Sequence, residues 1–179
     1  MNVEKEIPLL ESILGQWREV VGESFEGYKN HCYRMLNFCF FLHDCSDTEK
    51  KKLIISACFH DMGLWTQKTL DYLPPSVLLA ENFLKENKLN DWVEEVSLII
   101  DLHHKVTPYK EPEFPLVEVF RRADLTDFSL GMIKGGVTKA FVKDVKKAFP
   151  NAGFHKGLVK EQMKWLGKHP LNPAPIFKW

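Results

Sequence analysis

The chain has 179 residues, of which 45% are hydrophobic, which is enough to bury one sizeable core but too short to indicate two domains. Its 24 Lys and Arg residues balance its 24 Asp and Glu residues, so the formal net charge is zero. A neutral chain has no overall field that would attract nucleic acid or anionic membranes. We therefore predict one domain over residues 1–179, without a nucleic-acid partner.

The N-terminal segment carries acidic residues and lacks the basic flank and long apolar run of a secretory signal. No stretch approaches the roughly 18 consecutive apolar residues that a membrane span needs. The four cysteines form no Cys-x-x-Cys pair, so we expect reduced, buried thiols instead of a zinc or redox motif. These features predict a cytoplasmic protein that does not associate with a membrane.

The spacing of apolar residues predicts an all-α fold. Apolar residues recur at intervals of three and four along most of the chain, and strict alternation over the length of a strand is hard to find. We expect a compact bundle of about seven to eight helices, at 8–21, 25–44, 48–61, 75–87, 90–104, 114–130, 136–148 and 155–167. Asp47 is the expected N-cap of the third of these.

Two segments without a helical pattern could contact a substrate or another part of the protein. The connection 62–74 contains Lys68, Asp71 and Tyr72, and these side chains could contact a substrate. The proline-rich tail 169–179 ends in three apolar residues, Ile176, Phe177 and Trp179. We expect this tail to dock on the body of the chain or on the second subunit of a homodimer.

Four residues at three separated places carry the chemistry that the sequence suggests. They are His31 in the second expected helix, the pair His60-Asp61 at the end of the third, and Asp124 in the sixth. Neutral imidazoles and carboxylates are ligands of divalent cations, and a fold can gather them around one point. We therefore predict a metal site.

This ordered series His…His-Asp…Asp resembles the signature of the HD superfamily of metal-dependent phosphohydrolases. The resemblance rests on the text NHCYRML, ACFHDMG and FRRADLTD and spans about residues 25–130, leaving the C-terminal helices and tail at 131–179 outside the motif. It implies an HD-type helical bundle in which the four residues bind one divalent ion such as Mn, Ni, Zn, Mg or Fe. It further implies hydrolysis of a small phosphate ester or nucleotide by metal-activated water, with Asp61 at the catalytic centre.

His103 and His104 are candidates for catalysis, because binuclear members of the superfamily use extra histidines between the His-Asp pair and the last Asp. Those members also carry a histidine where this chain has Pro75 and Ser76, which favours a single metal. At least one of the two histidines would then bind substrate or pass protons. Adjacent helical side chains diverge by about 100°, so both are expected in one site only if their helix ends there.

Arg34 and Lys68 are the candidate substrate-binding cations. Arg34 follows His31 by three residues on the same helical face, where a guanidinium could hold two phosphate oxygens. The alternative for Arg34 is an ion pair with an acidic residue of a neighbouring helix. Asp127, three residues after Asp124, is placed either to orient a metal ligand or to lie on the helix surface.

Leu64 leaves the reaction class open. Hydrolytic branches of the superfamily often have Lys or Glu shortly after the His-Asp pair, whereas HDMGL looks closer to the HDLGLT text of the cyanamide hydratase-like branch. A hydratase or lyase of a small non-phosphorylated substrate is therefore an alternative, and so is a metal-stabilised ligand sensor. An apolar pocket without a cation would favour hydration, whereas an inward-pointing Arg34 or Lys68 would favour a phosphorylated substrate.

Overall fold

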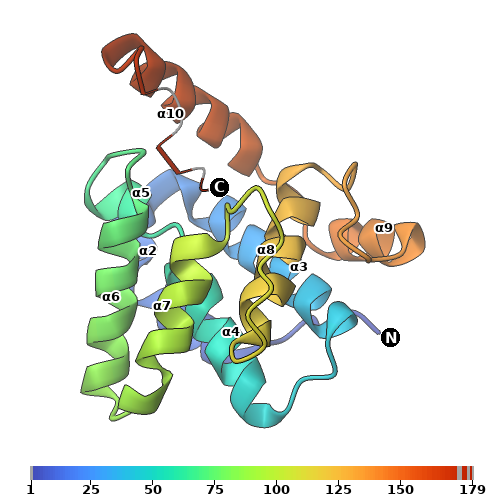
Figure 1. Ribbon diagram of the computed structural model, residues 1–179. Coiled ribbons are helices and arrows are strands. Elements are labelled where there is room, and N and C mark those ends of the chain that lie inside the picture. The colour runs from blue at the N-terminus through green and yellow to red at the C-terminus, as the bar shows by residue number, and fades with distance from the viewer. Residues whose placement is uncertain (1, 173–174, 177, 179) are drawn as a thin grey trace.

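The computed structural model describes residues 2–172, 175, 176 and 178, and the regular elements in this part of the chain are helices (Figure 1). They are α1 (Pro8–Gly15), α2 (Arg18–Val21), α3 (Phe25–Leu42), α4 (Asp47–Phe59), α5 (Gly63–Thr66), α6 (Leu73–Glu86), α7 (Val93–Leu102), α8 (Pro115–Phe128), α9 (Lys139–Ala148) and α10 (Phe154–Lys168), with 3-10 turns at Gly22–Ser24 and Asn90–Trp92. The prediction of an all-α bundle is confirmed for this part of the chain. None of the described helices is long and apolar enough to cross a bilayer.

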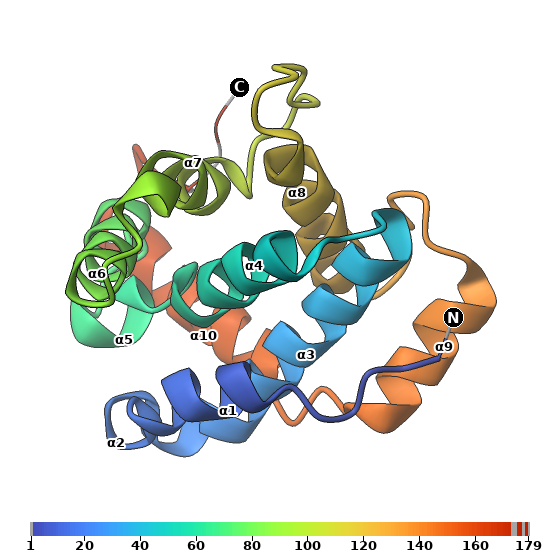
Figure 2. The same ribbon diagram turned by 90° about the horizontal axis from the view of Figure 1, so that it is seen from below.

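The centre of the bundle is formed by α3, α4, α7 and α8. The helix α3 packs against α4 and α8, and α7 lies between α6 and α8 (Figure 2). The side chains of Met35, Phe38 and Phe120 at these contacts are completely buried. Burying one such side chain contributes about 1.5–3 kcal/mol, so these contacts hold the helices that carry the predicted metal ligands in fixed positions.

The eight expected helices are present, with some differences at their ends. The expected helix 8–21 is divided after Gly15, because the chain turns at Gln16 and Trp17 before α2 begins. The expected helix 90–104 begins as a 3-10 turn and ends at Leu102. The connection 62–74 is not entirely irregular, since it contains the single helical turn α5.

The expected N-cap of α4 was wrong by one residue. Ser46, not Asp47, caps this helix: its hydroxyl accepts from the Glu49 N–H at 3.3 Å, and the Glu49 carboxylate accepts from the Ser46 N–H at 2.8 Å. This reciprocal pair is a capping box. The hydrogen bond from Ser46, together with the contact to His43, lowers the pKa of Glu49 from 4.5 to about 2.

We expect Ser46→Ala to lower the free energy of unfolding by about 1 kcal/mol at pH 7. Because the pKa of Glu49 is lower in the folded state, its contribution is fully present above about pH 4.5 and is lost as the pH falls towards 2. Urea unfolding at pH 7 and at pH 3 measures both effects. The control Thr48→Ala, in the same exposed turn, should leave stability almost unchanged; an equal loss would contradict this assignment.

The end of the chain returns to the body of the same molecule. The Val106 N–H donates to the Lys178 carbonyl at 2.7 Å, the Lys178 ammonium pairs with Asp101, and Ile176 is buried next to Tyr72. We call Pro175, Ile176 and Lys178 the C-terminal strap. Phe177 and Trp179, which were also expected to dock, lie outside the described residues, and the homodimer stays a prediction.

Candidate metal centre

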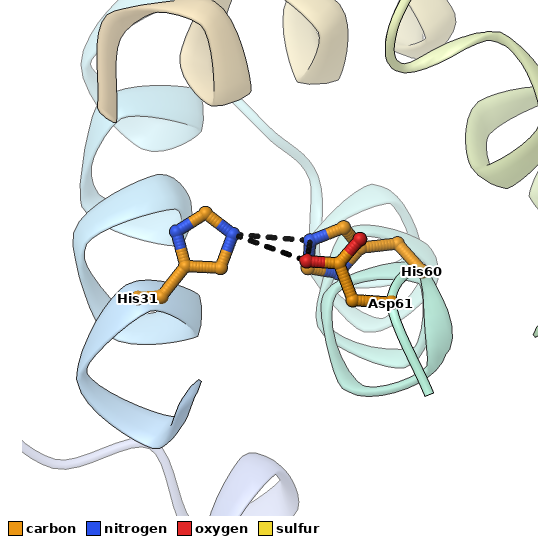
Figure 3. Close-up of side chains that lie close together, drawn as sticks. All are labelled: His31, His60 and Asp61. Atoms are coloured by element: carbon orange, nitrogen blue, oxygen red, sulfur yellow. Dashed lines mark hydrogen bonds and ion pairs between the residues drawn. The ribbon is translucent and has the colours of Figure 1, made fainter. Parts of the chain in front are cut away.

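Three segments bring the four predicted ligands close together, but only His31, His60 and Asp61 lie within 4.8 Å of one another, and Asp124 borders this group through His31. His31 lies in the middle of α3, His60 and Asp61 follow the last residue of α4, and Asp124 lies on α8. The His31 Nε2 atom is 3.1 Å from the His60 Nε2 atom and 4.0 Å from the Asp61 Oδ2 atom (Figure 3). It is 3.7 Å from the Asp124 Oδ1 atom. All four side chains are at least 95% buried. The predicted residues therefore form a compact buried cluster.

Hydrogen bonds at Nδ1 determine the tautomers of three histidine rings. The Nδ1 atom of His31 donates to the Asp127 carboxylate at 2.7 Å, and those of His60 and His103 donate to backbone carbonyls at 2.9 and 2.6 Å. Oxygen atoms of these groups only accept, so in neutral rings the protons lie on Nδ1 and each Nε2 carries a lone pair. The 3.1 Å contact therefore brings together two lone pairs, which a cation between them would stabilise.

Two buried polar atoms in the cluster have no hydrogen-bond partner among the described residues. They are the Asp61 Oδ1 atom and the His103 Nε2 atom, which lie 3.6 Å apart. Both are electron-pair donors, and buried polar atoms without a partner are rare in folded proteins. A divalent cation would satisfy both atoms, so the residues present are suited to hold one.

The pKa values of the cluster agree with ligand groups in a buried site. Burial lowers the pKa of His31 from 6.5 to about 4, against the opposing effect of Asp127, so its ring is neutral at neutral pH. Burial raises the pKa of Asp124 from 3.8 to about 7. Burial also opposes ionisation of Asp61, but His60 and His103 outweigh it and hold the pKa of this carboxyl well below its usual range.

His103 and His104 both face the cluster, because α7 ends at Leu102 and the backbone is free to turn both rings inward. The His104 Nδ1 atom is 3.3 Å from the Asp124 Oδ2 atom, and its Nε2 atom is 2.8 Å from the Tyr72 hydroxyl. Potential ligand atoms of Asp61, His103 and His104 lie within 4.8 Å of one another, as do those of His31, His60 and Asp61. Asp61 is thus common to two groups that could each hold an ion.

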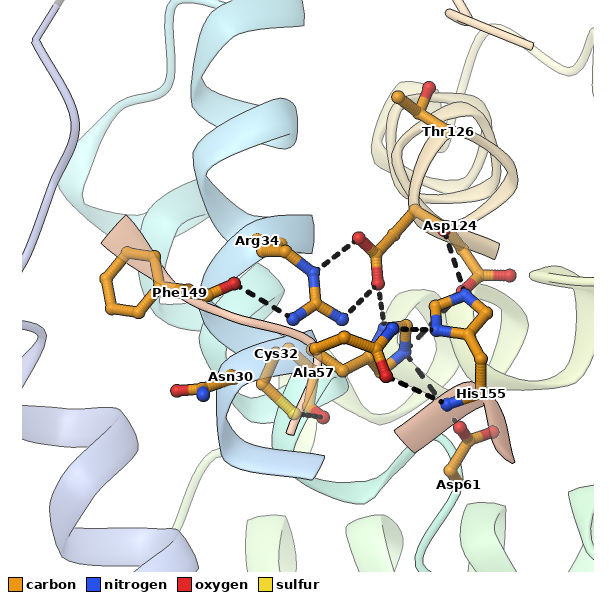
Figure 4. A network of polar contacts seen from close by, with 12 residues as sticks. Asn30, Cys32, Arg34, Ala57, Asp61, Asp124, Thr126, Phe149 and His155 are labelled. Carbon is orange, nitrogen blue, oxygen red and sulfur yellow. Dashed lines mark hydrogen bonds and ion pairs between the residues drawn. The ribbon is translucent and has the colours of Figure 1, made fainter. Parts of the chain in front are cut away.

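Arg34 does not reach the centre as the substrate-binding residue that was expected. Its guanidinium donates to both carboxylate oxygens of Asp127, at 2.6 and 2.7 Å, and to the carbonyl of Pro150. It also donates to the carbonyl of Phe149 (Figure 4). The expected alternative, an ion pair with a neighbouring helix, is what the structure shows. The ion pair with Arg34 holds the Asp127 carboxylate in contact with the His31 Nδ1 atom. Of the two positions expected for Asp127, the structure therefore shows the one that orients a predicted metal ligand.

Lys68 is also directed elsewhere. It is exposed and lines a surface depression of about 160 Å³ together with Lys164 and Lys168 of α10, and it does not line the cavity beside the cluster. The second His-Asp pair of the chain, at His43 and Asp44, lies at the other end of α3, where His43 pairs with Glu49 at 3.0 Å. Neither segment contributes to the candidate metal centre.

A cavity of about 180 Å³ opens directly beside the cluster. One end presents polar groups of His31, Asp61, His104 and Asp124. The remaining lining residues are Leu70, Tyr72, Phe128, Phe154, Leu158, Val159, Gln162, Met163 and Ile176. The described lining therefore contains no Lys or Arg, and most of its surface is apolar.

Tyr72 is a functional candidate that sequence patterns indicated only loosely. It is 2% exposed, lines the cavity and contacts His104, whereas the sequence placed it in a connection that could contact a substrate. Burial, together with the nearby carboxylates of Asp61 and Asp124, raises its pKa well above the usual value, so its hydroxyl stays protonated. Tyr72 immediately precedes α6, but its contact with His104, 32 residues further along the chain, depends on the tertiary fold.

The protein is thus an all-α bundle in which buried histidine and aspartate side chains form a candidate metal centre beside a cavity. The family model described as HD domain matches residues 28–129, more than half of the chain, and the protein belongs to this family. The match includes all four predicted ligands as well as His103 and His104. Searches of curated proteins and of solved structures gave no match.

Proposed function

We propose that this protein is a metal-dependent hydrolase of a small molecule, with His31, His60, Asp61 and Asp124 as the ligands of a divalent cation. The observation that carries the proposal is the set of buried lone pairs with no hydrogen-bond partner, at Asp61 Oδ1 and His103 Nε2, beside the facing Nε2 atoms of His31 and His60. A divalent cation supplies Lewis acidity and lowers the pKa of water, which replaces a covalent nucleophile.

The surrounding residues orient the ligands and handle protons. Asp127 and two backbone carbonyls fix the rings of His31, His60 and His103 by their Nδ1–H groups. The Nε2 atoms of His31 and His60 therefore face each other, and the Nε2 atom of His103 faces the Asp61 Oδ1 atom. His104 lies between the Asp124 carboxylate and the Tyr72 hydroxyl. Because an imidazole can accept at one nitrogen and donate at the other, His104 is the candidate for moving a proton at the polar end of the cavity.

The number of ions is a separate part of the proposal. The sequence favoured one cation, since the histidine expected at Pro75 and Ser76 is missing. The inward turn of both His103 and His104 supports a second position that shares Asp61 with the first. Measuring the metal content of the purified protein distinguishes one ion per chain from two.

The cavity bears on the choice between the two reaction classes. Hydrolysis of a phosphate ester is the activity typical of the family, but a phosphate dianion would then be neutralised by the metal alone, because Arg34 pairs with Asp127 and Lys68 lies outside the cavity. The apolar lining specifically favours the second candidate, addition of water to a small non-phosphorylated substrate. A complete nucleotide is also disfavoured, since about 180 Å³ is small for such a ligand.

The test is to incubate protein loaded with Mn, Ni, Zn or Fe with p-nitrophenyl phosphate and with cyanamide, measuring nitrophenol and urea. Turnover of either probe by the wild type, and its loss in His60→Ala, supports a metal centre that activates water. Release of nitrophenol identifies hydrolysis, and formation of urea identifies hydration. His43→Ala is the matched control, because this histidine also precedes an aspartate but lies outside the centre. Absence of bound metal in the wild type would refute the proposal, and metal without turnover would favour ligand sensing.

A further inference from the structure

The two halves of the cavity come from different parts of the chain. The polar end and its neighbours Tyr72 and Phe128 lie within residues 28–129, which match the HD domain. The opposite wall lies outside that match and consists of Phe154, Leu158, Val159, Gln162 and Met163 of α10 with Ile176 of the C-terminal strap. The polar groups of the cavity and the wall opposite them therefore come from separate segments of the chain.

The position of α10 over the metal centre is fixed at both ends of this wall. At the start of α10, the Phe154 ring stacks on the His31 ring with centroids 4.2 Å apart. At the strap, Ile176 packs against Tyr72 and Leu73 while Lys178 is held at Asp101 and Val106. Figure 1 shows α10 above the ends of the other helices, with the described part of the tail returning beneath it.

Charges on α10 are directed away from the cavity. The helix carries four lysines and one glutamate, yet none of these side chains lines the cavity; Glu161, Lys164 and Lys168 line the separate surface depression instead. Val159 and Met163 are 63% and 64% exposed and lie at the cavity rim. A charged substrate group placed against this wall would lose hydration without gaining a partner of opposite charge.

We propose that α10 and the C-terminal strap select a substrate in which the group that reacts at the metal is attached to a compact, uncharged, apolar body. This inference deepens the proposed function and rests on it. The volume of about 180 Å³ suits a body of the size of a single small ring or short branched chain, and it is below the roughly 300–1,000 Å³ of sites for larger ligands. Substrates with a second charged group fall outside this class.

Three hydroxamic acids test this class, because each binds a metal through the same group and differs only in its body. Acetohydroxamate has almost no body, benzohydroxamate has an apolar ring, and 4-carboxybenzohydroxamate adds a charge to that ring. We expect benzohydroxamate to bind the nickel- or zinc-loaded full chain at least about tenfold more tightly than either of the others, since burial of a ring is favourable only when it is uncharged. Isothermal titration calorimetry measures all three affinities.

The variant Met163→Lys places an ammonium in the wall at an exposed position, so the fold should be retained. It should weaken benzohydroxamate and tighten 4-carboxybenzohydroxamate, with no effect on acetohydroxamate. Leu166→Lys is the matched control, because Leu166 is another exposed apolar residue of α10 that does not line the cavity. Equal changes in both variants would overturn the inference.

The failure of this inference differs from the failure of the proposed function. If all three hydroxamates bind equally well, the metal centre is intact and the selection by α10 is refuted. If the protein retains no metal and binds none of them, the proposed function is refuted and the inference falls with it.

Discussion

Asp61→Asn is expected to remove bound metal from the protein and to reduce turnover by more than about a hundredfold. Changing groups that only support metal ligands already costs 10–100-fold in metal affinity or activity, and Asp61 is a ligand candidate in both groups of the cluster. Its carboxylate lies 3.3 Å from the His60 Nε2 atom, 3.6 Å from that of His103 and 4.0 Å from that of His31. Asparagine has the same shape but no negative charge to offset the cation.

Metal analysis and turnover, measured on the same preparation, check this expectation. Asp44→Asn is the matched control, because Asp44 also follows a histidine but is exposed at the end of α3. Thermal unfolding of both variants separates loss of metal from loss of fold. If Asp61→Asn retained its full metal content, Asp61 would not be a ligand and the shared-ligand arrangement would be wrong.

The residues that gather in the candidate metal centre could be predicted from the sequence because the information lies in residue type and order. The HD signature is defined by the order of His31, His60, Asp61 and Asp124 along the chain. The all-α fold follows from apolar spacing in the same way. The HD signature and the helical periodicity can both be read along the sequence, so neither prediction requires knowledge of how the helices pack.

The details that the sequence left open or gave wrongly depend on where helices end and which neighbours meet. The inward turn of both His103 and His104 requires α7 to end at Leu102, and helix ends are uncertain in sequence-based prediction by several residues. The capping box was visible as Ser46 followed by Glu49 three residues later, but Asp47 competed as a cap. The pair Ser46 and Glu49 is a more specific signal for a helix start than Asp47 alone, and it was visible in the sequence.

The cavity wall could not be predicted at all. The helix α10 was expected from its spacing, but periodicity does not reveal that its apolar residues cover a metal centre instead of a core. Arg34 presents the same difficulty, because its partner Asp127 is 93 residues away in the sequence. Long-range pairing of this kind is set by the packing of α3 on α8.

Arg34→Met is expected to lower the free energy of unfolding by about 3–5 kcal/mol, because it leaves the buried Asp127 carboxylate without its cation. Both side chains are at most 3% exposed, and the guanidinium also satisfies the carbonyls of Phe149 and Pro150. For a chain of this length the loss corresponds to a fall in Tm of roughly 10 °C. Metal affinity should fall as well, since Asp127 also fixes the Nδ1–H of His31.

Arg18→Met provides the comparison, because Arg18 also forms an ion pair, with Glu26 at 3.5 Å, but the two side chains are 60% and 57% exposed. Exposed pairs contribute about 0–1 kcal/mol, so this variant should unfold close to the wild-type temperature and keep its metal. Urea unfolding and calorimetric titration with Ni or Zn measure both properties in the two variants. A small stability loss in Arg34→Met, equal to that of Arg18→Met, would mean that another group neutralises Asp127; a large loss with unchanged metal affinity would show that Asp127 does not position His31.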